Sequence, residues 1–197
     1  YKDLNNDGKI DGGANTLFDH GDKKVIGNNT PRYRFALNLG FTYKNFDIST
    51  ILQGVMKRDF WEGDWNFWGW TGWLWRSTCY EEHTDYFRGD PEHWMGQNLD
   101  AYYPRPLDGS NQNMQVQSRY LQNGAYIRMK NLQMGYTLPK EVVNKIGISN
   151  LRFYVSGENL FTISGVKKMF DPEAMGYGTS SIGYPIRRTF SAGLSVT

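Results

Sequence analysis

The stretch from Ala125 to Phe161 decides the fold, and it reads AYIRMKNLQMGYTLPKEVVNKIGISNLRFYVSGENLF. Apolar and polar residues alternate in both of its arms, and a period of two is typical of strands with one apolar face. The alternating apolar positions are Ile127 and Met129, further along Leu132, Met134, Tyr136 and Leu138, and in the second arm Leu151, Phe153 and Val155. Pro139 ends the first arm because proline cannot donate a hydrogen bond to a neighbouring strand. The link that follows has room for about one helical turn closed by Gly147, so the sequence predicts two paired strands.

Three further segments alternate in the same way. Arg34 to Tyr43 (RFALNLGFTY) is followed by the two-residue turn signal Lys44-Asn45 and by a return strand from Phe46 to about Lys57. Arg187 to Thr197 reads as a last strand. The expected organisation is a loop over residues 1–32, a hairpin over 33–58, a loop over 59–124, a hairpin over 125–161, a loop over 162–186 and a strand over 187–197.

The composition favours strands and argues against several classes of protein. Only 39% of the 197 residues are hydrophobic but 16% are aromatic, which suits strands with one wet and one apolar face. The net charge of +2 is too small to indicate binding to nucleic acid. The single cysteine, Cys79, excludes an internal disulfide and a cysteine-rich zinc site. No signal peptide and no apolar run of about 18 residues is visible, so no membrane helix is predicted. The chain opens inside what reads as a loop, and we expect it to be a piece of something longer.

The lengths of the connections leave two architectures open. Long connections alternate with short turns, as in outer-membrane barrels, whose strands of about 10 residues span the hydrocarbon when tilted. A connection as long as 59–124 is uncommon in a compact soluble domain unless it is functional. The alternative is a soluble β-sandwich that buries one apolar face.

Several motifs resemble one family in their order and spacing. The segment GYTLPKEVVNKIGISNLRFYVSGENLFTIS, the tetrad Phe170-Asp171-Pro172-Glu173 and the terminal FSAGLSV resemble the C-terminal end of SusC/RagA-type TonB-dependent outer-membrane transporters of Bacteroidetes. The opening YKDLNNDGKID and the segment IGNNTPRYRFALNLGFTYKNFDIS are similar to the same family just upstream. The resemblance covers nearly the whole chain except residues 59–118. Two departures are that family chains normally end in an aromatic residue, whereas this one stops at Thr197, and that the plug domain and most barrel strands are absent.

The resemblance implies an all-β fold, namely an antiparallel transmembrane β-barrel segment of about five C-terminal strands with long extracellular loops. The whole barrel would have roughly 22 strands, and five of them cannot close, so this piece cannot be an autonomous membrane unit. The turns at Lys44-Asn45 and at 139–150 would be periplasmic. Residues 1–32, 59–124 and 162–186 would be extracellular.

The resemblance also implies a location and partners. The chain would lie in the outer membrane of a Gram-negative cell, in contact with lipid, and would take part in the import of oligosaccharides or peptides. A SusD-like surface lipoprotein would be its partner, and TonB would act through the missing N-terminal part. Polar positions such as Asn38, Arg128 and Glu158 could line the lumen.

Residues 3–11 contain the start of an EF-hand-like calcium loop, Asp3-x-Asn5-x-Asp7-Gly8-x-Ile10-Asp11. Oxygen ligands at alternate positions suit a hard cation on a flexible loop, and favour calcium over magnesium. The twelfth position should be acidic but is Ala14, and a later aspartate would replace it. The expected ligands are Asp3, Asn5, Asp7, Lys9 through its backbone carbonyl, Asp11 through a water, and Asp22. Asp22 would take the place of the acidic twelfth residue, and Asp19 is the alternative for that place. The alternative is an Asp/Asn/Gly turn stabilised by its own side chains.

The segment FWEGDWNFWGWTGWLW, from Phe60 to Trp75, is unusually aromatic. Its six tryptophans are Trp61, Trp65, Trp68, Trp70, Trp73 and Trp75. Indole rings can stack on the apolar faces of sugars, which would make them substrate-binding residues. Packing within the loop, or docking of a partner protein, is the favoured alternative, since Trp is enriched at interfaces as well.

No group of residues supports an enzyme. Glu81-Glu82-His83-x-Asp85, with His93, lacks a zinc-ligand spacing and reads as solvated charge. Cys79 has no identifiable base, and Arg105 between two prolines indicates a rigid loop rather than a site. The leading hypothesis is therefore transport, and the alternative is a soluble calcium-dependent carbohydrate-binding β-module. A dockerin-like adhesion module is disfavoured because the calcium loop occurs once and has no following helix.

Overall fold

The computed structural model describes residues 1–63, 65–69, 79–107, 112–175 and 186–197. The chain forms two compact units. One, called the loop unit here, comprises residues 1–28 and 60–121. The other, the sheet unit, comprises residues 29–59 and 122–197.

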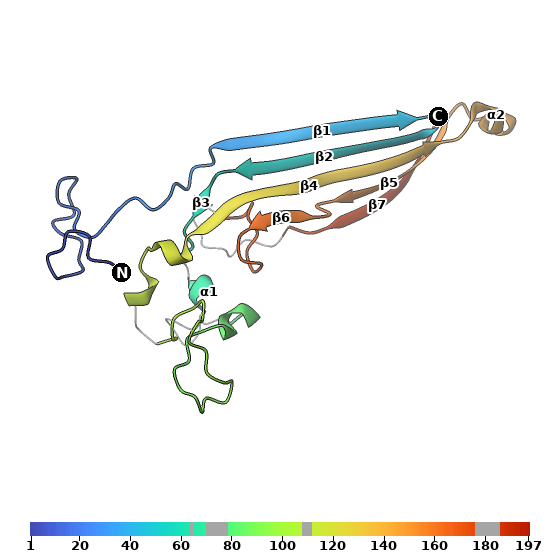
Figure 1. The fold of residues 1–197 in the computed structure, drawn as a ribbon. Coiled ribbons are helices and arrows are strands. Elements are labelled where there is room, and N and C mark those ends of the chain that lie inside the picture. The colour runs from blue at the N-terminus through green and yellow to red at the C-terminus, as the bar shows by residue number, and fades with distance from the viewer. Residues whose placement is uncertain (64, 70–78, 108–111, 176–185) are drawn as a thin grey trace. The chain divides into compact units, whose positions relative to one another are not determined.

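The sheet unit is an antiparallel sheet with strand order β1-β2-β4-β5-β7 (Figure 1). Its strands are β1 (Tyr33–Tyr43), β2 (Phe46–Met56), β4 (Gln122–Thr137), β5 (Leu151–Glu158) and β7 (Thr189–Val196), and two short strands, β3 (Asp59–Phe60) and β6 (Thr162–Gly165), are added to them. The predicted all-β antiparallel fold class is confirmed. The sheet is not closed, as expected for a piece of a barrel.

The short connections match the turn signals of the sequence. Lys44, at φ +53°, occupies the two-residue turn between β1 and β2. Between β4 and β5 the chain makes a helical turn, α2 (Lys140–Val143), continued by a 3-10 turn over Asn144–Ile146. Gly147 ends it at φ +74°, a left-handed conformation that favours glycine.

The strands differ from the expected ones in two places. β4 begins at Gln122, three residues before the predicted start of the hairpin. β6 lies inside the segment expected to be a loop over 162–186, and pairs with β4 where β5 has ended. Asn159, at φ +53°, interrupts the β5–β6 path, and its N–H donates to the Lys130 carbonyl at 3.1 Å. A strand of four residues is too short to show a periodic pattern, which is why the sequence did not reveal it.

A β-bulge in β4 explains a break in the apolar alternation of that strand. Ile51 of β2 pairs with Asn131, and the next residue, Leu52, pairs with Met129, so Lys130 is an extra residue. A bulge of this kind places two successive residues on the same side of the sheet. The three-residue step from Met129 to Leu132 therefore keeps both on the apolar face.

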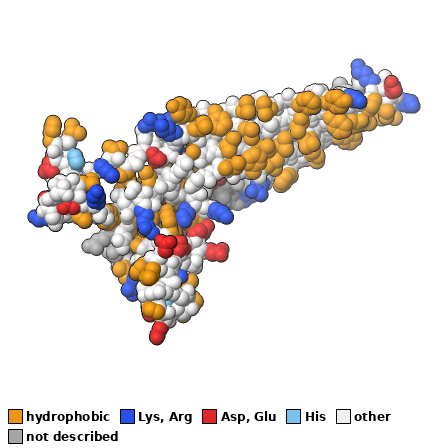
Figure 2. Space-filling model, in the orientation of Figure 1, with side chains coloured by type: hydrophobic (Ala, Val, Ile, Leu, Met, Phe, Trp, Pro, Cys, Tyr) orange, Lys and Arg blue, Asp and Glu red, His pale blue; other side chains and the backbone are white. Residues whose placement is uncertain are grey.

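The two faces of the sheet differ in chemistry, and the apolar one is exposed. The strand register aligns apolar side chains in rows across all five strands. One row is Tyr43, Phe46, Tyr136, Phe153 and Leu194, and the next is Phe41, Ile48, Met134, Val155 and Ala192. Phe41 is 64% exposed and Val155 55% exposed. Figure 2 shows hydrophobic side chains gathered along the sheet.

The loop unit is built around buried aromatic rings. Its regular elements are α1 (Trp65–Trp68) and 3-10 turns over Glu81–Thr84, Gln112–Met114 and Ser118–Tyr120. Phe67 has no exposed surface, and its ring centroid lies 4.9 Å from that of Trp68 and 5.5 Å from that of Tyr103. None of the helices in the described part of the chain is long and apolar enough to cross a membrane.

Candidate functional sites

The polar face of the sheet carries an ion pair that lies over a glycine. The Arg152 guanidinium donates to Asp47 through Nε at 3.0 Å and through Nη2 at 2.5 Å. The two side chains meet over Gly135, where an added Cβ would overlap Arg152 Nη2 and crowd Asp47 Oδ1. A side chain at this position would displace the pair from the geometry observed, so residues of three strands together define this part of the polar face.

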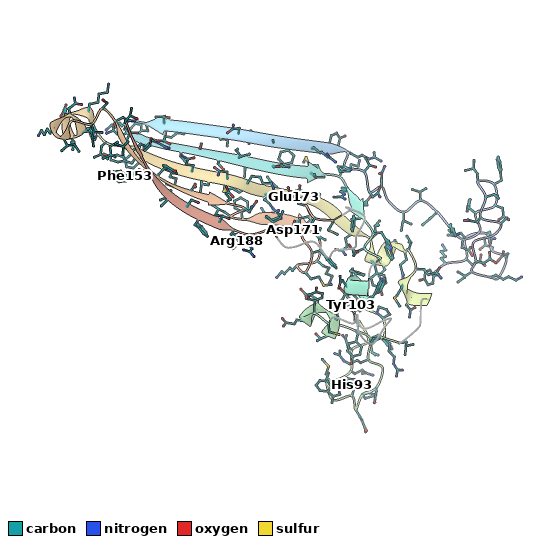
Figure 3. The ribbon with its side chains drawn as sticks, turned by 180° about the vertical axis from the view of Figure 1, so that it is seen from behind. His93, Tyr103, Phe153, Asp171, Glu173 and Arg188 are labelled. Atoms are coloured by element: carbon teal, nitrogen blue, oxygen red, sulfur yellow. The ribbon has the colours of Figure 1, made fainter. Side chains whose placement is uncertain are left out.

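A second ionic network ties the Phe170-Asp171-Pro172-Glu173 tetrad to β4 (Figure 3). Arg128, whose side chain is 3% exposed, donates to Asp171 Oδ2 at 2.7 Å and to Glu173 Oε2 at 2.6 Å. Lys130, the bulge residue, donates to Glu173 Oε1 at 2.7 Å. Arg128 Nε also donates to Thr162 Oγ1 at 2.8 Å. The network therefore holds Asp171 and Glu173 against the polar face of β4, next to the start of β6.

Only part of this network could be predicted from the sequence. Arg128 was expected to line the lumen, and the register does place it on the polar face, opposite Gln53. The other two positions expected to line the lumen are Asn38 and Glu158. Both lie on the same face, in one row of paired residues that also contains Ile51 and Asn131. The tetrad was recognised only as a motif, because its partners are more than 40 residues away in the chain.

The EF-hand-like segment folds into a tight loop of side-chain to backbone hydrogen bonds. Asp3 accepts from the N–H groups of Asn6 at 2.6 Å and Gly8 at 2.9 Å. Asp7 Oδ1 accepts from the N–H of Lys9 at 2.8 Å. Further bonds of this kind hold Asn5 and Asp11.

The structure distinguishes the two aspartates considered for the twelfth ligand position. Asp22 accepts from Leu4 N–H at 2.6 Å and from Asp11 N–H at 2.9 Å, so it joins the loop of the other expected ligands. Both bonds lower the pKa of the Asp22 carboxyl group, and the bond from Leu4 has the larger effect. Asp19 instead accepts from Ala14 N–H within the inserted segment. No group of three or more His, Cys, Asp or Glu side chains that could hold a metal ion is found among the described residues.

The Trp-rich segment is described only in part. Trp68 is 5% exposed and packs edge-to-face on Tyr120, with ring centroids 4.8 Å apart. Trp61 lies with its ring centroid 6.1 Å from that of Trp68. Only the backbone of Trp65 is described, and Trp70, Trp73 and Trp75 lie outside the described residues. The two tryptophans with described side chains thus pack against other rings of the loop unit.

The acidic and histidine cluster after Cys79 has structural partners. His83 accepts from Tyr80 N–H at Nδ1, at 2.9 Å, and its Nε2 lies 3.0 Å from the Phe67 carbonyl. Burial lowers the pKa of His83, which favours the neutral ring with its proton on Nε2. Asp85 accepts from Asn98 Nδ2 at 2.9 Å, and His93 Nε2 lies 3.3 Å from the Tyr86 hydroxyl. These contacts hold turns together and form no acid–base pair.

Comparisons with known proteins find TonB-dependent receptors that are similar to this chain. It is 30% identical over 189 residues to TonB-dependent receptor P3 of Formosa agariphila, an alignment that covers 89% of this chain and 17% of that receptor. It is 26% identical over 209 residues to TonB-dependent receptor P26 of the same organism, covering all of this chain and 19% of that receptor. The chain thus spans less than a fifth of these curated relatives. No protein-family model matches it.

Solved structures show the same fold. The chain superposes on the RagAB peptide transporter with a TM-score of 0.64 at 22% identity, over 88% of this chain and 18% of that one. The RagAB peptide importer in its closed-closed state gives a TM-score of 0.62 at 23% identity, over the same shares.

Proposed function

We propose, from the premise that this chain is a segment of a SusC/RagA-type TonB-dependent receptor, that it forms part of the wall of an outer-membrane importer. The observation that carries the proposal is the exposed apolar face of the sheet. Rows of Phe, Leu, Ile and Val run across five paired strands, with polar and charged side chains on the opposite face. Membrane barrels place apolar side chains against lipid and polar ones toward the lumen.

The alternative function, a soluble carbohydrate-binding module, would require the apolar face of the sheet to be buried. A soluble protein would have to bury these rows, because contiguous apolar patches beyond a few hundred Å² are rare on soluble monomers. Within the sheet unit, no described element covers them. The exposed rows therefore favour the importer over the module.

Spin labels on adjacent residues of β5 would test the proposal in the full-length receptor in lipid vesicles, with Cys79 replaced by Ser. Labels at Phe153 and Val155 should be accessible to oxygen, which concentrates in the bilayer, and those at Tyr154 and Ser156 to a water-soluble nickel chelate. An alternation with a period of two supports a wall between lipid and lumen. Equal accessibility of both sets to the nickel chelate would contradict it.

The cargo and the partner belong to the same proposal. The relatives are named as receptors, and the structural neighbours are described as peptide transporters or importers. We propose that the whole receptor imports oligosaccharides or peptides, with a SusD-like lipoprotein on the cell surface and TonB acting through the part of the receptor upstream of this chain. Deletion of the lipoprotein gene should abolish uptake of the cargo while the receptor stays in the membrane.

Calcium binding by the loop of Asp3 to Asp11 is a further part of the proposal. It is supported by the spacing of oxygen-bearing side chains and by the position of Asp22 beside Asp11. Hydrogen bonds from the backbone leave lone pairs on each carboxylate, which has about four acceptor positions. Calorimetric titration with calcium should give heat for the full-length receptor and for Asp19→Asn, and a weaker affinity for Asp22→Asn. No heat at millimolar calcium would remove the claim.

A further inference from the structure

The loop unit carries a cleft of about 430 Å³ lined by aromatic rings and two arginines. Ligand sites for small molecules typically have volumes of about 300–1,000 Å³. The rings of Tyr102 and Tyr120 stand edge-to-face in its wall, with centroids 5.3 Å apart. Burial raises the pKa of both tyrosines, so their hydroxyl groups stay neutral at physiological pH. The wall is thus a fixed apolar surface with neutral polar tips.

The charged groups of the cleft are all positive. Arg119 donates to the Ala101 carbonyl at 2.6 Å, which fixes its guanidinium beside the rings. Arg105 lies between Pro104 and Pro106, is exposed, and has no ion pair among the described residues. No Asp or Glu of the described residues lines the cleft. This is unlike the loop unit as a whole, in which fourteen Asp and Glu outnumber eight Lys and Arg.

A buried donor adjoins the cleft. A small pocket of about 20 Å³ shares Tyr103 and Arg105 with the cleft and is also lined by Trp68. That volume holds about one water-sized group. The indole Nε1 of Trp68 is buried and has no hydrogen-bond partner among the described residues. An indole N–H can only donate, so this position requires an acceptor.

We propose that the cleft binds a ligand that carries a carboxylate next to an apolar ring face. The guanidinium of Arg105 pairs with the carboxylate, the Trp68 N–H donates to an acceptor of the ligand or to a water that the ligand holds, and the rings of Tyr102 and Tyr120 cover the apolar face. Two sources supply this chemistry: a uronic acid of an acidic oligosaccharide, and the C-terminal carboxylate of a short peptide. The proposal deepens the proposed function, on which it rests for the role of the ligand.

Calorimetry with two matched pairs of probes tests this in the detergent-solubilised full-length receptor. One pair is trigalacturonic acid and its methyl ester, and the other is the tripeptide Ala-Ala-Phe and its C-terminal amide. The acid of one pair should bind at least about tenfold tighter than its neutral partner, since a charged hydrogen bond contributes about 1.5–3 kcal/mol and 1.4 kcal/mol is tenfold. The pair that shows the difference identifies the source.

Substitutions assign the effect to the cleft. Arg105→Gln should weaken binding of that acid at least about tenfold, and Trp68→Phe, which keeps a ring and removes the N–H, should weaken it about threefold to tenfold. Lys24→Gln removes an exposed positive charge of the same unit and should change nothing. Circular dichroism checks that each variant is folded, and Arg105→Lys, a milder change, should retain part of the affinity.

The overturning outcomes are distinct from those of the proposed function. Equal binding of acid and neutral probes, no binding of either acid, or unchanged affinity in folded Arg105→Gln would each overturn the cleft proposal. Binding needs no transport, so these results leave the spin-label test of the barrel wall untouched. A failed spin-label test would likewise leave the calorimetric result standing.

Discussion

The sheet unit and the loop unit use the same kinds of side chain in opposite ways. In the loop unit Phe67 is completely buried, whereas in the sheet unit Phe41 is 64% exposed. The loop unit gathers its aromatic rings inward, as a protein in water does. The sheet unit turns its apolar rows outward and keeps ion pairs on the other face. The comparison teaches that exposure of apolar side chains, when it is periodic and in register, identifies the medium around a segment rather than a defect in its packing.

The charges of the two units differ as well. Lys and Arg outnumber Asp and Glu by fourteen to six in the sheet unit, and the loop unit has the reverse excess. The net charge of +2 for the whole chain conceals this division. An average over the chain was therefore the wrong quantity from which to judge the charge of either surface.

The largest expected effect tests the inward packing of the loop unit. Phe67→Ala should lower its local free energy of unfolding by about 3–5 kcal/mol, because the ring is fully buried among other rings. Hydrogen–deuterium exchange of the full-length receptor over residues 79–107 measures this. Phe18→Ala, the same substitution at a side chain that is 96% exposed, should stay within about 0.5 kcal/mol. Similar losses for both variants would show that the loop unit has no aromatic core.

The next effect tests the outward packing of the sheet unit. Val155→Arg should destabilise the receptor in lipid vesicles by about 2–4 kcal/mol, because a charged side chain would enter the hydrocarbon. Ser156→Arg, one residue along β5 on the polar face, should cost much less. Denaturant unfolding followed by tryptophan fluorescence measures both. An equal cost for the two substitutions would mean that the faces do not meet different media.

A somewhat smaller effect is expected at the polar face. Removing one partner of a buried ion pair typically costs about 3–5 kcal/mol. Arg128→Met should cost less than this, about 2–3 kcal/mol, because Asp171 and Glu173 keep some solvent exposure and Lys130 still pairs with Glu173. Faster amide exchange over residues 162–175 would reveal the loss.

Arg188, an exposed residue directly before β7, provides the control for that substitution. Arg188→Met should leave exchange over residues 162–175 unchanged, since Arg188 has no ion pair among the described residues. Unaltered exchange in Arg128→Met would show that the network does not hold the tetrad in place.

The smallest expected effect depends on pH and is confined to the loop unit. Burial lowers the pKa of His83 in the folded state, so the unfolded state binds the proton more readily. The stability that this ring contributes is complete above the ordinary histidine pKa of about 6.5, and is lost as the pH falls through that value toward the lower pKa of the folded state. Amide exchange of the loop unit should therefore be faster at pH 5 than at pH 7 after correction for the intrinsic rate. His83→Asn, which keeps an acceptor and does not titrate, should flatten this dependence, and a persistent slope would assign it to another group.

The strands could be predicted because the local sequence of each one shows its alternating pattern. Five strands of eight residues or more alternate with a period of two, and Pro139, Gly147 and the Lys44-Asn45 turn indicate where they end. The bulge was also visible in the sequence, because Met129 and Leu132 are three residues apart where regular alternation requires two or four. β6 could not be predicted, because four residues are too few to show an alternating pattern.

The sites were less predictable because they depend on distant residues. Arg128 and Asp171 are 43 positions apart, and no local pattern connects them. The Trp-rich segment was conspicuous, but its composition did not tell a core from a binding surface. Arg105 was interpreted as part of a rigid loop, and only the packing of Tyr102, Tyr103 and Tyr120 around the cleft suggests a role for its charge.

The extra residue in β4 has a mechanical consequence. A bulge bends its strand and increases the local right-handed twist, so the part of β4 that begins at Gln122 diverges from the direction of the part that ends at Thr137. Lys130 could be deleted without moving any other side chain to the opposite face, since Met129 and Asn131 would then alternate regularly. Such a deletion would straighten β4 and remove one of the two cations that pair with the carboxylates of the tetrad. The course of β4 beside the tetrad is in this sense adjustable by a single residue.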